Sequence, residues 1–341
     1  MIKDAITKLI AFEDITAEEA AASMYEIMSG EATTAQIGAF LAAMRMKGET
    51  AGEIMGCAQV MREKAEHVTL NRDAIDIVGT GGDGANTFNI STCSAFVVAA
   101  AGVPVAKHGG RSVSSRCGAA DVLESLGANI TLTPEQAAGC FERAGLCFMF
   151  APAYHKSMKH AAGPRKELGL RTIFNILGPL ANPAAAQYQL LGVCEEKLVE
   201  PLARVLMSLG VKAAMSVHSQ DGLDEISVSA PTTVCEVRGG RMTGYILHPG
   251  EFGIAKSSPE DIRGGDAALN AQILLAILKG QRGPKRDVVL LNSGAALYVA
   301  GRAATIRQGV ALAAEAVDSG SALQKLELYK AVSMGFQEAA S

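Results

Sequence analysis

The sequence predicts an α/β protein, with a small all-helical N-terminal domain and a large α/β domain that has a mostly parallel central sheet. Helix-capping patterns and apolar residues at helical spacing fill residues 1–70. Beyond residue 76, short apolar runs alternate with glycine-rich loops and apolar helices, an order typical of a parallel sheet. The 341 residues, of which 49% are hydrophobic, are enough for about two domains.

Residues 1–70 are expected to form helices that end at glycines. Gly30 and Gly48 stand where helix C-caps belong. We expect a small helical bundle or a dimerisation surface, completed by about residues 165–183. Capping boxes mark the helix starts and pair Thr16 with Glu19, Thr33 with Gln36 and Thr50 with Glu53.

The α/β domain is expected to span residues 71–164 and 184–341. A hairpin is predicted where residues 233–237 and 242–247 flank a Gly-Gly turn. The expected strands are 77–78, 103–106, 213–217, 226–228 and 288–291, and the expected helices are 91–101, 119–126, 172–177 and 269–278.

Charge and cysteine usage exclude several classes of protein. Lys plus Arg number 31 and Asp plus Glu number 35. The net charge of −4 argues against a protein whose whole surface binds nucleic acid. The 7 cysteines are scattered without a CxxC pair, which argues against a disulfide framework or a zinc site. The start lacks the apolar core of a signal peptide, and no apolar stretch approaches the roughly 18 residues of a membrane span. We therefore expect a cytoplasmic protein.

A glycine-rich loop follows the first expected strand. Residues 76–92 read DIVGTGGDGANTFNIST, with a G-x-G-x-x-G pattern that begins at Gly79. A dinucleotide site would need an acidic residue after the next strand, where this chain has Lys107, and the Walker Lys-Ser/Thr pair is absent. Converging backbone N–H groups, and the start of a helix near Ser91, still favour an anion. The alternative, a simple tight turn, stays open.

A second loop, residues 107–118, reads KHGGRSVSSRCG and combines cations, hydroxyls and glycines. At the carboxyl end of a parallel strand it would face the first loop across the ligand crevice. Two such loops suggest a ligand with two phosphate groups or one diphosphate. A solvated basic loop is the alternative.

Three charged residues downstream of these loops are further candidates for the site. Asp224 and Glu225 are adjacent carboxylates after a turn, and magnesium in proteins uses one or two carboxylates plus substrate phosphates. Arg165 follows Pro164 and could pair with a carboxylate in a bidentate manner. A surface acidic pair and an ordinary helix arginine are the alternatives.

Taken together, four segments resemble the anthranilate phosphoribosyltransferase family. They are residues 76–92, residues 107–127 (KHGGRSVSSRCGAADVLESLG), residues 163–183 (GPRKELGLRTIFNILGPLANP) and residues 218–225 (HSQDGLDE). Residues 264–271 and 291–301 are also similar. The resemblance implies a homodimer that, in tryptophan biosynthesis, transfers a phosphoribosyl group from 5-phosphoribosyl 1-diphosphate (PRPP), bound with Mg²⁺, to the amine of anthranilate.

The resemblance also implies a role for particular residues, by their place in the motifs. Lys107, Asp224 and Glu225 would be catalytic, and Ser91, Asp224 and Glu225 would hold Mg²⁺. PRPP would be bound by Gly79, Gly82, Asp83, Thr87, Asn89, Ile90, Ser91, Thr92, Lys107, Arg111, Ser115 and Ala119. Anthranilate would be bound by Gly79, His108, Gly110, Pro152, His155 and Arg165.

The chain departs from the family pattern at three positions, of which Cys117, a frequent alternative to Ser, carries little weight. Gly110 stands where the family usually has Asn, so a side-chain hydrogen bond to the acceptor is lost, and Ala119 stands where many members have Ser. Two other functions stay open. One is a pyrimidine nucleoside phosphorylase-like enzyme, and the other is a non-catalytic homologue that binds nucleic acid in the same cleft.

Overall fold

The computed structural model describes residues 1–111 and 117–338. Its N-terminal part is a bundle of helices whose starts are capped as predicted. Each of the three predicted capping boxes is present, with both of its hydrogen bonds. Gly30 follows α2 with φ of 77°, and Gly48 follows α3 with φ of 89°. The helices are α1 (Ile2–Ile10), α2 (Ala17–Ser29), α3 (Thr34–Lys47) and α4 (Ala51–Glu63).

The chain returns to this bundle after the third strand. Helix α9 (Lys159–Leu168) packs on α2 and α3, and α10 (Phe174–Leu177) packs on α4. Ala161, Ile173 and Leu177 are fully buried in the same apolar cluster as the N-terminal helices. The returning segment therefore begins at α9, slightly before residue 165.

The second part is built on a mixed sheet, which has seven strands in the described residues, ordered β3-β2-β1-β4-β5-β6-β7. The pairs from β3 to β5 are parallel, and β6 and β7 add an antiparallel hairpin. The strands are β1 (Ile75–Gly79), β2 (Val105–Gly109), β3 (Leu146–Phe150), β4 (Tyr188–Gly192), β5 (Ala213–Ser219), β6 (Thr232–Arg238) and β7 (Arg241–Leu247).

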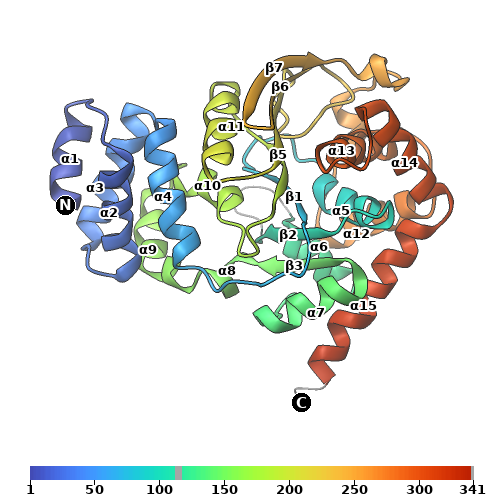
Figure 1. Cartoon of the computed structure of the whole chain (residues 1–341), viewed down its shortest axis with the longest axis horizontal. Coiled ribbons are helices and arrows are strands. Elements are labelled where there is room, and N and C mark those ends of the chain that lie inside the picture. Colours follow the sequence, from blue (N-terminus) through green and yellow to red (C-terminus); the bar gives the residue numbers. More distant parts are fainter. Residues whose placement is uncertain (112–116, 339–341) are drawn as a thin grey trace.

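Different helices cover the two faces of the sheet (Figure 1), and the two faces bury different apolar clusters. Since side chains alternate along a strand, Leu190 joins the cluster beneath α5 and α13, whereas Leu191 joins the cluster shared by α11 and the bundle. The remaining helices are α5 (Ile90–Ala100), α6 (Ala119–Ser125), α7 (Pro134–Ala144), α8 (Ala151–Tyr154), α11 (Val199–Ser208), α12 (Ala267–Leu278), α13 (Pro284–Val299), α14 (Ile306–Asp318) and α15 (Ser321–Glu338). Short 3-10 turns lie at Lys156–Met158, Gly178–Leu180, Glu196–Leu198, Pro249–Phe252 and Pro259–Ile262.

Two predicted strands are wrong. Residues 288–291 lie inside the buried helix α13, because a short apolar run is equally compatible with a buried helix. Residues 226–228 are irregular. The backbone of Ile226 pairs with the Asn292 side chain of α13, donating to Oδ1 (3.0 Å) and accepting from Nδ2 (2.9 Å). The Asn292 side chain thus supplies the hydrogen bonds that a neighbouring strand would otherwise give to the backbone of Ile226.

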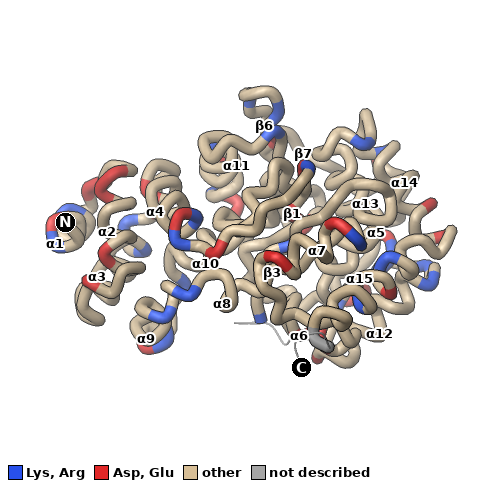
Figure 2. Tube along the Cα trace, turned by 60° about the horizontal axis from the view of Figure 1, so that its bottom comes forward, with Lys and Arg blue, Asp and Glu red and all other residues tan. Residues whose placement is uncertain are grey.

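Charge is mixed over the molecule. Figure 2 shows acidic and basic residues interspersed along the trace of the described chain. Among the described helices, none has both the length and the apolar character needed to cross a bilayer.

Candidate active site

A cleft of about 320 Å³ lies at the carboxyl ends of β1 and β2, where the two glycine-rich loops meet α9 and α10. It therefore has the position that parallel strands give to ligand sites. Of the predicted site residues, it is lined by Gly79, Gly82, Ser91, Lys107, His108, Gly110, Arg111, Ala119 and Arg165. Those not in its lining are Asp83, Thr87, Asn89, Ile90, Thr92, Pro152, His155, Asp224 and Glu225. Ser115 lies outside the described residues.

The first loop is folded onto Asp224. The Gly81 N–H donates to Oδ2 of Asp224 (2.7 Å), and a side chain at Gly79 would collide with that carboxylate. Gly81, Gly82 and Gly84 have φ between 66° and 77°, a region that disfavours residues with a side chain. The glycines are thus required by the fold of the loop and by its contact with the acidic turn.

Three carboxylates lie around this turn. Asp83 accepts from the backbone N–H of Asp224 (3.5 Å), and Glu225 follows directly. Burial and the charge of Asp83 raise the pKa of Asp224, and burial and the charge of Asp224 raise the pKa of Glu225. A divalent cation would relieve this repulsion, and oxygen donors of this kind suit Mg²⁺.

This cation would depend on further ligands. In the part of the chain that the structure describes, no group of three or more His, Cys, Asp or Glu side chains is arranged to hold a metal ion. Asp224 and Glu225 therefore fit an ion that shares oxygen ligands with a bound phosphate compound, as magnesium commonly does in proteins.

Lys107 is the buried cation of the cleft, with 3% of its surface exposed. Its Nζ donates to the carbonyl of Ile77 and to Ser91 Oγ (3.2 Å). Burial lowers the Lys107 pKa, and the charges of Asp76 and Glu225 oppose this shift. Sequence reasoning did not assign a role to Asp76, which is fully buried with a pKa raised by burial to about 6.

The start of α5 is held by Asn89. Its Nδ2 donates to the carbonyl of Cys117 (3.1 Å), and its Oδ1 accepts from Asn270 Nδ2 (3.0 Å). The Asn89 side chain makes no capping hydrogen bond to the helix, and the N-terminus of a helix favours an anion. Ile90 and Thr92 are buried beneath this turn.

Two histidines pack together on the side of the cleft near α8. The ring centroids of His108 and His155 are 5.0 Å apart, and Nδ1 of His108 lies 3.1 Å from the carbonyl oxygen of Gly178. Burial and the neighbouring His155 lower the His108 pKa to about 3. Burial lowers the His155 pKa to about 4, although the Ala181 carbonyl acts in the opposite direction. Both rings are neutral at physiological pH.

The arginines of the cleft differ in their partners. Arg111 pairs with Asp121 (2.7 Å) and with Glu124 on α6, and 49% of its side chain is exposed. Arg165 stacks over Phe174 with 5.0 Å between its Cζ and the ring centroid. Arg171 also lines the cleft and was not predicted as a site residue. Its signal in the sequence was its place in the 163–183 motif, six residues after Arg165.

Comparison with known proteins identifies the family to which this cleft belongs. Residues 71–323 match the glycosyl transferase family a/b domain, and residues 3–65 match the helical bundle domain of the same family. The chain is 55% identical over 338 residues to anthranilate phosphoribosyltransferase of Ruminiclostridium cellulolyticum, covering 99% of each protein. It is 56% identical to the enzyme of Methanobrevibacter smithii, covering 96% of this chain and 98% of the relative. The chain belongs to the anthranilate phosphoribosyltransferase family.

Solved structures of anthranilate phosphoribosyltransferases share the whole fold. The enzyme of Thermus thermophilus matches with a TM-score of 0.91 and 42% identity, over 96% of this chain and 99% of that chain. The enzyme of Saccharomyces cerevisiae in complex with PRPP and Mg matches with a TM-score of 0.90 and 27% identity, over 98% of both chains. The predicted resemblance and fold class are thereby confirmed.

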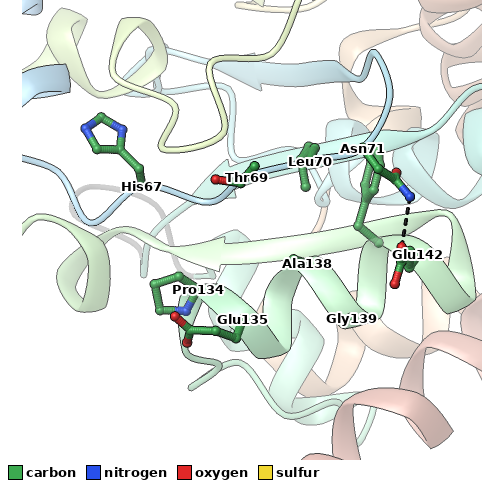
Figure 3. Close-up of a pocket in the computed structure, with 10 residues that line it drawn as sticks. His67, Thr69, Leu70, Asn71, Pro134, Glu135, Ala138, Gly139 and Glu142 are labelled. Atoms are coloured by element: carbon green, nitrogen blue, oxygen red, sulfur yellow. Dashed lines mark hydrogen bonds between the residues drawn. The ribbon is translucent and has the colours of Figure 1, made fainter.

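A separate groove of about 390 Å³ lies between residues 67–71 and α7 (Figure 3). Asn71 Nδ2 donates to Glu142 Oε1 (2.9 Å) across its end. None of the site residues predicted from the anthranilate phosphoribosyltransferase motifs lines it. The cleft between the two glycine-rich loops is therefore the candidate active site.

Proposed function

We propose that this protein transfers the phosphoribosyl group of PRPP to the amine of anthranilate and releases diphosphate, in tryptophan biosynthesis. The observation that carries this proposal is the cleft itself. It joins a glycine-rich anion loop and Lys107 to Arg165 and the neutral His108 within one cavity. A phosphorylated donor and an aromatic carboxylate acceptor need these two kinds of surface side by side.

The donor side is assigned to the first loop and the residues behind it. Backbone N–H groups of the loop and the N-terminus of α5 would bind the diphosphate, and Lys107 would neutralise part of its charge. Ser91, Asp224 and Glu225 would hold Mg²⁺. When bound, Mg²⁺ stabilises the negative charge that develops on the departing diphosphate.

The acceptor side is assigned to Arg165 and His108. The Arg165 guanidinium, which lies over the Phe174 ring, would bind the anthranilate carboxylate in a bidentate manner. The amine nitrogen then forms a bond to C1 of the ribose while the bond from C1 to the diphosphate oxygen breaks. The amine loses one proton to solvent. Because an aromatic amine is nucleophilic when neutral, we assign no general base.

We include a homodimer in the proposal. The exposed apolar side chains Ile10, Phe12 and Met46 are 64%, 65% and 73% exposed. The ion pair of Asp14 with Lys47 (2.7 Å) joins the segment after α1 to the end of α3, so these three residues lie on segments that are neighbours in the fold. Exposed apolar side chains on neighbouring segments support an interaction surface. Analytical ultracentrifugation should give twice the chain mass of 35.4 kDa, and Met46→Glu should shift it to the single chain.

The experiment that tests the function follows anthranilate fluorescence in the presence of protein, PRPP and Mg²⁺. The proposal predicts a loss of fluorescence that requires all three. Phosphorolysis of thymidine or uridine, without that loss, would favour the phosphorylase alternative. Steeply salt-dependent binding of single-stranded DNA without turnover would favour the nucleic-acid-binding alternative.

A further inference from the structure

The cations that line the cleft are not equally neutralised. Lys107 is buried near the charges of Asp76 and Glu225. Arg111 is paired with Asp121 and Glu124 of α6. Neither of the other two, Arg165 and Arg171, forms an ion pair with any described residue. Two guanidinium groups are thus available for anions.

The proposed reaction brings two substrates that carry anions, and geometry separates the two arginines. Arg165 lies over Phe174, on the wall assigned to the acceptor. Arg171 lies against the donor loop, since a side chain at Gly82 would collide with its Nη1. The same guanidinium donates through Nη2 to Cys194 Sγ (3.0 Å). A thiol is a weak acceptor, so this contact gives the charge little stabilisation.

Cys194 is itself tied to the donor loop. Its backbone N–H donates to Thr80 Oγ1 (3.1 Å), and the Thr80 N–H donates to the carbonyl of Gly192 (2.9 Å). Arg171 is therefore held between the end of β4 and the glycines of the first loop, with its charge uncompensated by any described carboxylate.

We propose that Arg171 is a PRPP-binding residue, whose guanidinium exchanges the Cys194 thiol for a phosphate group of the donor. This assignment rests on the proposed function. Phosphate oxygens accept charge-assisted hydrogen bonds far better than sulfur does, and the planar guanidinium can donate two in parallel. Arg171 acts in binding and takes no part in the making or breaking of a bond.

The test compares Arg171→Ala and Arg171→Lys with Arg165→Ala, and uses Arg204→Ala as the control for loss of one exposed charge on α11. PRPP is titrated calorimetrically into each protein in the presence of Mg²⁺. The affinity of Arg171→Ala for PRPP should be about 10- to 100-fold weaker than that of the parent protein, the usual effect of losing hydrogen bonds to a charged group. The KM for anthranilate should stay within about twofold of the parent value. Arg171→Lys should recover part of the affinity, because it retains the charge but lacks the fork.

Arg165→Ala should show the converse, with a raised KM for anthranilate and unchanged PRPP binding. Unchanged PRPP affinity in a folded Arg171→Ala protein would overturn the inference. A raised KM for anthranilate without weaker PRPP binding in that variant would also overturn it. Thermal unfolding checks that each variant is folded, and Arg171→Lys provides the test if the alanine variant is not. If the parent protein binds PRPP but does not turn over anthranilate, the proposed function is contradicted. The assignment of Arg171 to PRPP binding is not affected by that result.

Discussion

The backbone N–H of Gly81 donates a 2.7 Å hydrogen bond to the carboxylate of Asp224, residues that are far apart in the sequence. This bond joins the anion loop after β1 to the acidic turn after β5. The loop that would bind the diphosphate and the carboxylates that would hold its metal ion are thus parts of one structural unit. A change on either side is expected to affect both.

Gly79→Ala should damage the site and the fold together. Its Cβ would overlap the Asp224 carboxylate, so either the loop or the acidic turn must move. We expect a loss of about 1–3 kcal/mol in the free energy of unfolding, as for other overpacked sites, and a large fall in kcat/KM. Gly110→Ala is the matched control for stability, since a Cβ there meets nothing within 4 Å. Equal unfolding curves for Gly79→Ala and the parent protein would contradict this account.

Asp224→Asn combined with Glu225→Gln should reduce turnover by roughly 100-fold or more, because the metal and the leaving group lose their charged ligands. Neutral amides do not repel one another, so stability should be retained. The measurement is the initial rate as a function of Mg²⁺ concentration. Near-parent rates at limiting Mg²⁺ would refute the metal role of this pair.

Acid should unfold the protein partly through His108 and His155. Their pKa values are lowered to about 3 and about 4, so the folded state keeps both rings neutral while the unfolded chain binds protons below pH 6.5. Stability is therefore complete above pH 6.5 and falls as the pH drops towards 4. At pH 5 the proton uptake of the unfolded chain at each histidine lowers the free energy of unfolding by about 2 kcal/mol. Urea unfolding of His155→Gln should show a shallower fall between pH 6.5 and pH 4, and an unchanged slope would contradict the assignment.

Thr33→Ala should weaken α3 by removing its N-cap. Thr33 Oγ1 accepts from the N–H of Gln36 (3.3 Å), and the Gln36 side chain accepts from the N–H of Thr33 (2.8 Å). We expect a loss of about 1 kcal/mol in the free energy of unfolding. Thr34→Ala changes the neighbouring exposed residue and leaves the cap in place, so its unfolding midpoint should match the parent protein. Equal effects of the two changes would show that the cap contributes nothing.

Local signals explain which parts of the fold were predictable. The capping boxes and the Gly-Gly hairpin depend on residues close in sequence, and the structure has all of them. Strands β3 and β4 were not predicted, because both are short and largely buried and therefore lack the alternating pattern of a half-exposed strand. The same apolar character misled the assignment of residues 288–291, which the packing of α13 against α5 and α14 makes helical. Tertiary context decides such segments.

Site residues could be predicted where a short sequence motif by itself indicates anion binding. The glycine-rich loop and Lys107 were expected at the cleft and lie there. The partners of Arg111 could not be foreseen, because they depend on how α6 presents Asp121 and Glu124. The contact of Arg171 with Gly82 likewise depends on the positive φ of that glycine and on the approach of the 163–183 segment.

The most direct test of the central claim is the rate at which anthranilate fluorescence is lost in a mixture of protein, PRPP and Mg²⁺. The account predicts steady loss that stops when any one component is omitted, with one diphosphate released for each anthranilate consumed. Unchanged fluorescence with the folded parent protein, accompanied by turnover of a different aromatic amine, would contradict the assigned acceptor. Unchanged fluorescence with no diphosphate released from PRPP by any amine would contradict the assigned reaction.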